Sequence, residues 1–171
     1  LRIMGYSVYD TDSEAKRLME SSLEVVQKLS ECFGRDIYHN GRLNRGLLSS
    51  RVFGKSDKIV LLNSIVHPVV RFDFYRWSES LNEEICFVES AILYESRFDE
   101  LVDEVWTVTA PEELRISRVR QRSGLTEEEI KKRMAAQLSE EEKQRRAAHI
   151  IWNDGNVSVI HRVLSLLKSL E

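Results

Sequence analysis

Residues 7–18 of this chain read SVYDTDSEAKRL, and they mark a point where an extended segment turns into a helix. The β-branched and aromatic residues at the start favour a strand, and the apolar residues that follow fall on one helical face. Asp10 and Asp12 lie at the junction. Ligands of open α/β sheets gather outside the carboxyl ends of the strands, so both acids are candidates for a catalytic base or a magnesium anchor. The alternative is that Asp12 only caps the helix, because Asp is a favoured N-cap residue.

Composition limits the class of protein. The 171 residues are enough for one well-buried domain with room for an inserted subdomain, and the net charge of -3 argues against a general nucleic-acid binder. Cys32 and Cys86 match no metal-ligand spacing, which indicates free thiols in a reducing compartment. No apolar run approaches the roughly 20 residues that span a bilayer, and no signal-peptide pattern is present. We therefore expect a cytoplasmic protein with neither membrane nor nucleic acid as a partner.

The region from residue 13 to residue 82 is predicted to be helical. Its apolar spacing predicts four helices around a polar, glycine-containing turn at 33–41; the helices span 13–29, 43–53, 58–66 and 68–80. Pro68 fits the first position of the last helix, which places His67 just before it. Because no strand interrupts these helices, we interpret the region as a helical insertion that binds substrate.

Three short apolar runs then have the character of buried strands; they are residues 85–88, 105–108 and 150–152. Helical patterns lie between and after them, which is typical of a parallel sheet covered on both faces. Between the last two runs, capping boxes are expected to begin helices at Thr126 and at Ser139. Asn156 is the expected cap of the terminal helix.

The string Gly54-Lys55-Ser56 resembles the end of a phosphate-binding loop. Ser49 stands where that motif requires glycine, and Gly54 joins two predicted helices instead of following a strand. A cradle of backbone N–H groups needs the strand-to-helix turn. We therefore do not assign Lys55 to a nucleotide phosphate.

The basic residues of the 113–147 segment fall into two kinds. Residues 131–133 each follow a glutamate by four positions, so they are predicted to form a solvated, self-paired helix face. Arg118 and Arg122 share a helix face and have no glutamate four positions earlier, so they can face a polyanion, as phosphoryl transfer requires. Lys143 follows three glutamates and is ambiguous by itself.

Seven short segments, in order from about residue 5 to residue 155, together resemble the dephospho-coenzyme A (dephospho-CoA) kinase family. The first resembles the family's Asp-Ala-Asp, and the second resembles its Gly-x-Leu-x-Arg. The segments are VYDTD at 8–12, GRLNR at 41–45, LNSIVHP at 62–68, ILYE at 92–95, Arg118 to Arg122, Gln137 with EEK at 141–143, and IWNDG at 151–155.

The resemblance implies an enzyme that transfers the γ-phosphoryl group of ATP, with Mg²⁺, to the ribose 3′-hydroxyl of dephospho-CoA. It implies an α/β fold, a P-loop kinase-like parallel sheet flanked by helices, with a helical substrate-binding insertion and a helical lid. On this basis the nucleotide-binding core comprises residues 1–12, 83–112 and 148–171. The coenzyme A-binding region is 13–82, and the lid is 113–147.

The resemblance also implies residue roles. Asp12 would accept the hydroxyl proton, and Asp10 would support it or order the waters of the magnesium ion. Arg118 would lie against the transferring phosphate. The remaining residues implied for the site are Arg122 and Lys143 from the lid, Arg45, His67 and Glu95 at the acceptor, and Asn153 to Gly155 near the adenine. For His67 the residues leave a purely structural role open, since imidazole is an able hydrogen-bonding group.

Three departures from the family pattern stand out. The family's P-loop and first strand are absent from this chain, whereas Ala91 and Ala148 are mild substitutions. Loss of a central strand would leave buried backbone groups unpaired, at a few kcal/mol each, so we expect roughly 20 further residues before Leu1. Without them the chain is expected to be inactive. The alternatives are a non-catalytic binder of coenzyme A-like ligands or another small-molecule kinase on the same core.

Overall fold

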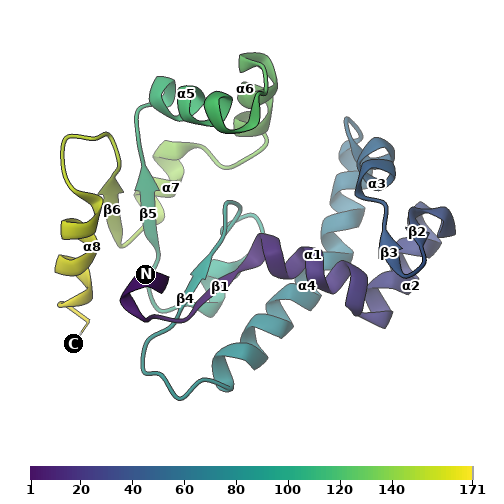
Figure 1. The fold of residues 1–171 in the computed structure, drawn as a ribbon, viewed down its shortest axis with the longest axis horizontal. Helices are drawn as coiled ribbons and strands as arrows, with labels where there is room; N and C mark the ends of the chain where they lie inside the picture. Colours follow the sequence, from purple (N-terminus) through teal and green to yellow (C-terminus); the bar gives the residue numbers. More distant parts are fainter. Residues whose placement is uncertain (171) are drawn as a thin grey trace. The chain divides into compact units, whose positions relative to one another are not determined.

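The computed structural model describes residues 1–170 and divides into two compact units, Leu1–Ser96 and Arg97–Glu171. Each unit contains a parallel strand pair flanked by helices (Figure 1). The predicted α/β class is therefore confirmed. Within the described part of the chain, no helix has both the length and the apolar character needed to cross a membrane.

The first unit is built on the parallel pair β1 and β4, aligned so that Asp10 lies opposite Glu89. Its elements in chain order are η1 (Arg2–Met4), β1 (Val8–Asp10), α1 (Thr11–Ser21), α2 (Leu23–Phe33), η2 (Arg35–Ile37), β2 (Tyr38–His39), β3 (Arg42–Leu43), α3 (Arg45–Val52), α4 (Ser56–Glu79) and β4 (Phe87–Glu89). Val25, Leu29 and Ile37 are at most 1% exposed and form the centre of the helical part of this unit.

The single helix expected over residues 13–29 is in fact two helices, so that prediction is wrong. Ser22 adopts an extended conformation between α1 and α2, and its side chain accepts a hydrogen bond from the backbone N–H of Val25. A serine that caps the next helix satisfies a donor which an interrupted helix would otherwise leave unpaired.

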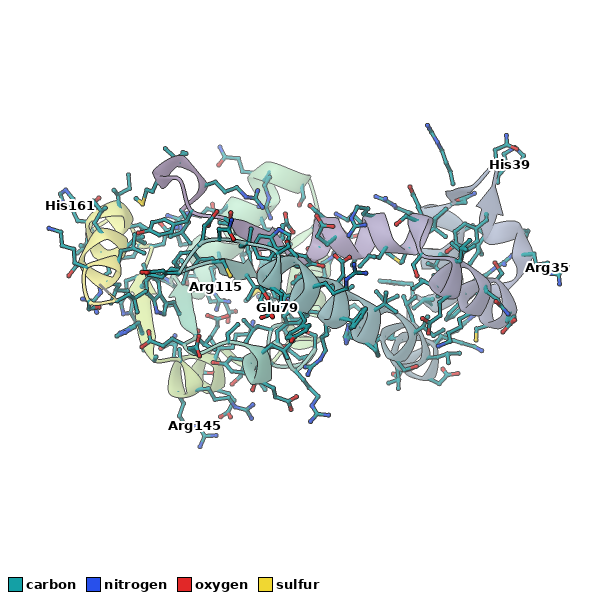
Figure 2. All side chains as sticks on the ribbon, turned by 90° about the horizontal axis from the view of Figure 1, so that it is seen from below. Arg35, His39, Glu79, Arg115, Arg145 and His161 are labelled. Carbon is teal, nitrogen blue, oxygen red and sulfur yellow. The ribbon has the colours of Figure 1, made fainter. Side chains whose placement is uncertain are left out.

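The region expected to be an irregular turn contains a short hairpin, β2 and β3. Its two turn residues, Asn40 and Gly41, both have positive φ angles, 50° and 75°. An Asn-Gly pair favours this type I′ turn because its twist matches that of the flanking strands. His39 lies beside the turn at the end of the hairpin (Figure 2).

The expected break at Pro68 is also wrong, because α4 continues through it. Val66, Val70 and Phe74 are buried at helical spacing on both sides of the proline, and α4 packs along this stripe against α1 and α2. Burial of these side chains offsets the one backbone hydrogen bond that proline removes. His67 therefore lies inside a helix and not before one.

The second unit is built on the parallel pair β5 and β6, in which Thr109 lies opposite Trp152. Its elements are η3 (Phe98–Leu101), β5 (Trp106–Thr109), α5 (Glu112–Ser123), α6 (Glu127–Ala135), α7 (Glu140–Arg146), β6 (His149–Trp152) and α8 (Val159–Leu167). In Figure 1, α8 lies beside β6, and α5 follows the carboxyl end of β5.

The predicted helix caps have mixed outcomes. Thr126 forms the complete capping box with Glu129, and the side chain of Ser139 accepts a hydrogen bond from the N–H of Glu142. The prediction for Asn156 is wrong, because Ser158 caps α8. Asn156 instead donates its N–H to Asp154, within a turn that delays the start of the helix.

Candidate functional site

The carboxyl end of β1 holds the first pair of predicted site residues. Asp10 ends the strand and caps α1: its Oδ1 accepts from the Ser13 N–H at 3.1 Å, and its Oδ2 accepts from the Ser13 hydroxyl at 2.9 Å. The Ser13 backbone N–H holds the pKa of the Asp10 carboxyl below its usual range. The capping role considered for Asp12 therefore belongs to Asp10.

Asp12 lies one residue into α1 and is exposed. No hydrogen bond or ion pair to its carboxylate is found within residues 1–170. Its neighbour Thr11 is buried and donates its hydroxyl to the Glu89 carbonyl at 2.9 Å, which ties the start of α1 to β4. The backbone around Asp12 is thus anchored while its carboxylate stays available to a ligand, and the helix N-terminus favours its negative charge.

Substitutions at Asp10 should measure how much its helix cap contributes to stability. Asp10→Ala should lower the free energy of unfolding by about 1 kcal/mol, because the Ser13 N–H loses its acceptor. Asp10→Ser should keep stability within a few tenths of that of the native protein, since serine also caps helices well. Urea unfolding of both variants measures this; equal stability of the two would show that the cap contributes nothing.

The residues expected at the acceptor lie on three segments of the first unit. Arg45 begins α3 and pairs with Glu20 of α1 at 3.3 Å, His67 is half-buried in α4, and Glu95 is exposed in the turns after β4. Burial, together with the positive charge of Arg71 one turn later, holds the pKa of His67 below its ordinary value. The lowered pKa favours the neutral form of His67. The joint role of these residues stays a prediction.

The lowered pKa of His67 should make stability depend on pH. Below about pH 6.5 the unfolded chain binds a proton that folded His67 resists, so the free energy of unfolding should fall as the pH drops through this value. His67→Gln should flatten that fall in urea titrations between about pH 7.5 and pH 5. Identical pH profiles for native protein and His67→Gln would contradict the argument.

The second unit brings two predicted nucleotide-site residues together at the carboxyl ends of β5 and β6. The exposed Arg118 of α5 donates from Nη1 to the carbonyl of Asn153 at 2.6 Å, and the Asn153 N–H donates to the carbonyl of Thr109 at 2.7 Å. The pKa of Asp154 is lowered by the N–H of Asn156 and, more weakly, by the charge of Arg118. Arg118 therefore holds the loop that was expected to border the adenine.

Lys143 is the most buried of the predicted cationic site residues, with a side chain 15% exposed. Its Nζ donates to Oε1 of Gln137 at 2.9 Å and lies 3.8 Å from Oε1 of Glu140. Glu140 also pairs with Arg115 at 3.0 Å and accepts the hydroxyl of Thr109 at 2.9 Å. Sequence reasoning missed this polar network; the closeness of Glu140 to Lys143 along one helix was the only signal of it.

Arg122 is exposed in the last turn of α5. Arg118 donates to the carbonyl of Asn153, whereas no carboxylate is found paired with Arg122 among residues 1–170. The charge of Arg122 is therefore left to solvent or to a ligand. Its role as a lid cation stays a prediction.

Two segments that the sequence analysis rejected as phosphate-binding sites are the Gly54-Lys55-Ser56 string and the basic residues 131–133. Gly54 lies between α3 and α4 with a φ angle of 74°, not after a strand. Of the pairs expected for residues 131–133, Lys131 pairs with Glu127 at 2.7 Å on the exposed face of α6, whereas the Glu129 carboxylate accepts hydrogen bonds from Thr126. A similar surface pair joins Arg145 to Glu142, and Figure 2 shows Arg145 projecting away from the ribbon.

The comparison with known proteins gives a consistent result. The family model described as dephospho-CoA kinase matches residues 1–158. A dephospho-CoA kinase of Bacteroides fragilis is 36% identical over 171 residues, which cover 99% of this chain and 83% of that protein. One from Porphyromonas gingivalis is 35% identical, over 99% of this chain and 85% of its own length.

Solved structures agree in fold. The crystal structure of TT1252 from Thermus thermophilus is similar with a TM-score of 0.83 and 33% identity, covering 98% of this chain and 86% of that one. Dephospho-CoA kinase from Campylobacter jejuni has a TM-score of 0.70 at 23% identity, covering 99% and 89%, and supports the fold alone. The resemblance inferred from seven short segments is therefore confirmed, and this chain belongs to the dephospho-CoA kinase family.

Proposed function

We propose that the protein phosphorylates the ribose 3′-hydroxyl of dephospho-CoA with ATP, giving coenzyme A and ADP. Family membership supports the reaction class. The observation that carries the assignment of the base is the contrast between two neighbouring acids: Asp10 has both carboxylate oxygens engaged, whereas Asp12 has an exposed carboxylate on an anchored backbone.

In this proposal Asp12 accepts the proton of the 3′-hydroxyl as its oxygen attacks the γ-phosphorus of ATP. The new O–P bond forms while the bond from phosphorus to the β–γ bridging oxygen breaks, and ADP leaves with the electron pair. A positioned carboxylate that takes up the proton is the usual device for such an acceptor. Asp10 keeps the first turn of α1 in place and so supports Asp12.

The cationic side chains proposed to meet ATP lie in the second unit. Arg118 neutralises charge on the transferring phosphoryl group, with Arg122 and Lys143 contributing from the 113–147 segment, which we propose as the lid. Asn153 to Gly155 border the adenine. Lys143 reaches ATP by exchanging its contact with Gln137 for a phosphate oxygen.

Magnesium is the metal that this chemistry implies, and the acids present are compatible with it. Mg²⁺ is commonly held by one or two carboxylates together with waters and substrate phosphates. Asp12, and Glu89 at the end of β4 opposite Asp10, offer exposed carboxylates for such a water-mediated site. The ion would supply neutralisation of phosphate charge when bound with ATP.

The acceptor is assigned to the helical region 13–82, with Arg45, His67 and Glu95 shaping its site. We propose residues 1–12, 83–112 and 148–171 as the nucleotide-binding core. Arg45 is held by Glu20 of α1, so an acceptor phosphate must compete with a carboxylate for the guanidinium.

The direct test is an assay of the full-length gene product, including whatever precedes Leu1, with ATP, Mg²⁺ and dephospho-CoA. We expect coenzyme A and ADP in equal amounts by mass spectrometry. Binding of dephospho-CoA without turnover would favour a non-catalytic binder. Preference for another acceptor in a competition assay would favour a different small-molecule kinase.

A further inference from the structure

Asp73 of α4 contacts both the strand that precedes Asp12, β1, and the helix that contains it, α1. Its Oδ2 accepts a hydrogen bond from the phenol of Tyr9 in β1 at 2.7 Å and from Nη2 of Arg17 in α1, also at 2.7 Å. One carboxylate oxygen therefore connects three elements of the first unit. This connection takes no part in the reaction as proposed above.

The hydrogen bonds of Asp73 to Tyr9 and Arg17 are held in place by neighbouring side chains. Tyr9 is 3% exposed, and its ring packs against Phe74 and Trp77, each with centroids 5.3 Å away. Burial, the hydrogen bond to Asp73 and the negative charge of that carboxylate raise the pKa of Tyr9, so its phenol stays a donor. Arg17 is also held by Glu14 at 2.5 Å, which fixes its guanidinium toward Asp73.

The position of the connection along the chain gives it a bearing on Asp12. Tyr9 precedes Asp12 by three residues, and Arg17 follows it by five. The carboxylate of Asp12 has no tether of its own within residues 1–170, so its direction depends on how α1 is seated. Asp73 contributes to this placement together with the Thr11 hydrogen bond to Glu89, because it holds β1 and α1 to the same point on α4.

We propose that Asp73 is a positioning residue for the transfer reaction: through Tyr9 and Arg17 it fixes α1 so that the carboxylate of Asp12 meets the acceptor hydroxyl. The inference rests on the proposed role of Asp12 as the base. It adds that part of the catalytic rate depends on a side chain of the substrate-binding helix that contacts neither substrate.

The test compares Asp73→Asn in the native background and in an Asp12→Asn background, using the full-length protein. Asparagine is isosteric with aspartate but uncharged, so the link to Arg17 weakens. In the native background we expect kcat to fall about 10- to 100-fold, because a small misplacement of a catalytic group has effects of this size. KM for dephospho-CoA should change less than about twofold. In the Asp12→Asn background the same substitution should lower kcat no further, since the group to be positioned is gone.

Asp36→Asn is the matched control, because Asp36 pairs with Arg51 across two elements of the same unit and away from β1 and α1. It should leave kcat and KM unchanged. Tyr9→Phe removes only the phenol donor and should also lower kcat. If Asp73→Asn does not fold, Tyr9→Phe tests the positioning role in its place. Thermal unfolding of each variant reports its folded fraction.

The outcomes distinguish the positioning role of Asp73 from the role of Asp12 as the base. An equal loss of kcat from Asp73→Asn in both backgrounds, with Asp12→Asn itself impaired, would overturn the positioning role and leave the base assignment standing. Unaltered kcat in Asp73→Asn and Tyr9→Phe would do the same. Full turnover by Asp12→Asn alone would remove the base, and the positioning role with it.

Discussion

Asp12→Asn should lower kcat for coenzyme A formation by about 10²- to 10⁴-fold in the full-length protein, the range by which a positioned general base accelerates proton transfer. Asparagine has nearly the same size and shape but cannot take up the hydroxyl proton. Because the Asp12 side chain is exposed and makes no described contact, the variant should lose only the few tenths of a kcal/mol that a negative charge contributes at a helix N-terminus, and should stay folded. Steady-state kinetics and thermal unfolding measure the two effects.

The matched control for this variant is Asp57→Asn. Asp57 is likewise exposed and lies in the first turn of a helix of the same unit, α4. It should retain full turnover, which separates loss of the base from loss of a negative charge at a helix N-terminus. Turnover in Asp12→Asn equal to that of Asp57→Asn would remove Asp12 from the mechanism.

Arg118→Gln should lower kcat by about 10²- to 10³-fold, as removal of one group that stabilises transition-state charge does. The substitution also removes the donor to the Asn153 carbonyl, so KM for ATP should rise. Arg118→Lys should recover only part of the loss, because an ammonium group restores the charge without the planar, multiply donating geometry. Steady-state kinetics at varied ATP concentration separates kcat from KM.

The control for Arg118 is Arg145→Gln on α7. The Arg145 side chain is 75% exposed and pairs only with Glu142 in the described contacts, so its removal should leave both constants unchanged. If Arg118→Gln raised KM for ATP but kept kcat, Arg118 would serve the Asn153 loop alone and would not face the transferring phosphate.

Features that depend on residues within four positions of one another were predictable from the sequence. The Thr126 capping box and the pair between Glu127 and Lys131 have the structure expected of them. Such contacts form within one helical turn, so their energies depend little on the rest of the chain. The parallel pairing of the strands was also predictable, but for another reason: a helix between two strands carries the chain back, so that the strands can run in the same direction.

Where two local solutions were close in energy, distant residues decided between them. Pro68 can begin a helix or lie within one, and burial of Val66, Val70 and Phe74 against α1 and α2 selected the second. Asp12 could have capped α1, but β1 pairs with β4 as far as Asp10, and that places the cap at Asp10 and the first helical residue at Thr11.

The sequence by itself determined the family and placed two acids, Asp10 and Asp12, at the strand-to-helix junction, because ordered motifs and helix and strand periodicity are properties of the chain. Only the tertiary structure decided which acid is engaged and which is free. It also brought Asp73 to Tyr9 across 64 positions and to Arg17 across 56. Contacts at such separations form only once the core between β1, α1 and α4 is packed. Closing so long a loop has an entropic cost that interactions between sequence neighbours do not offset.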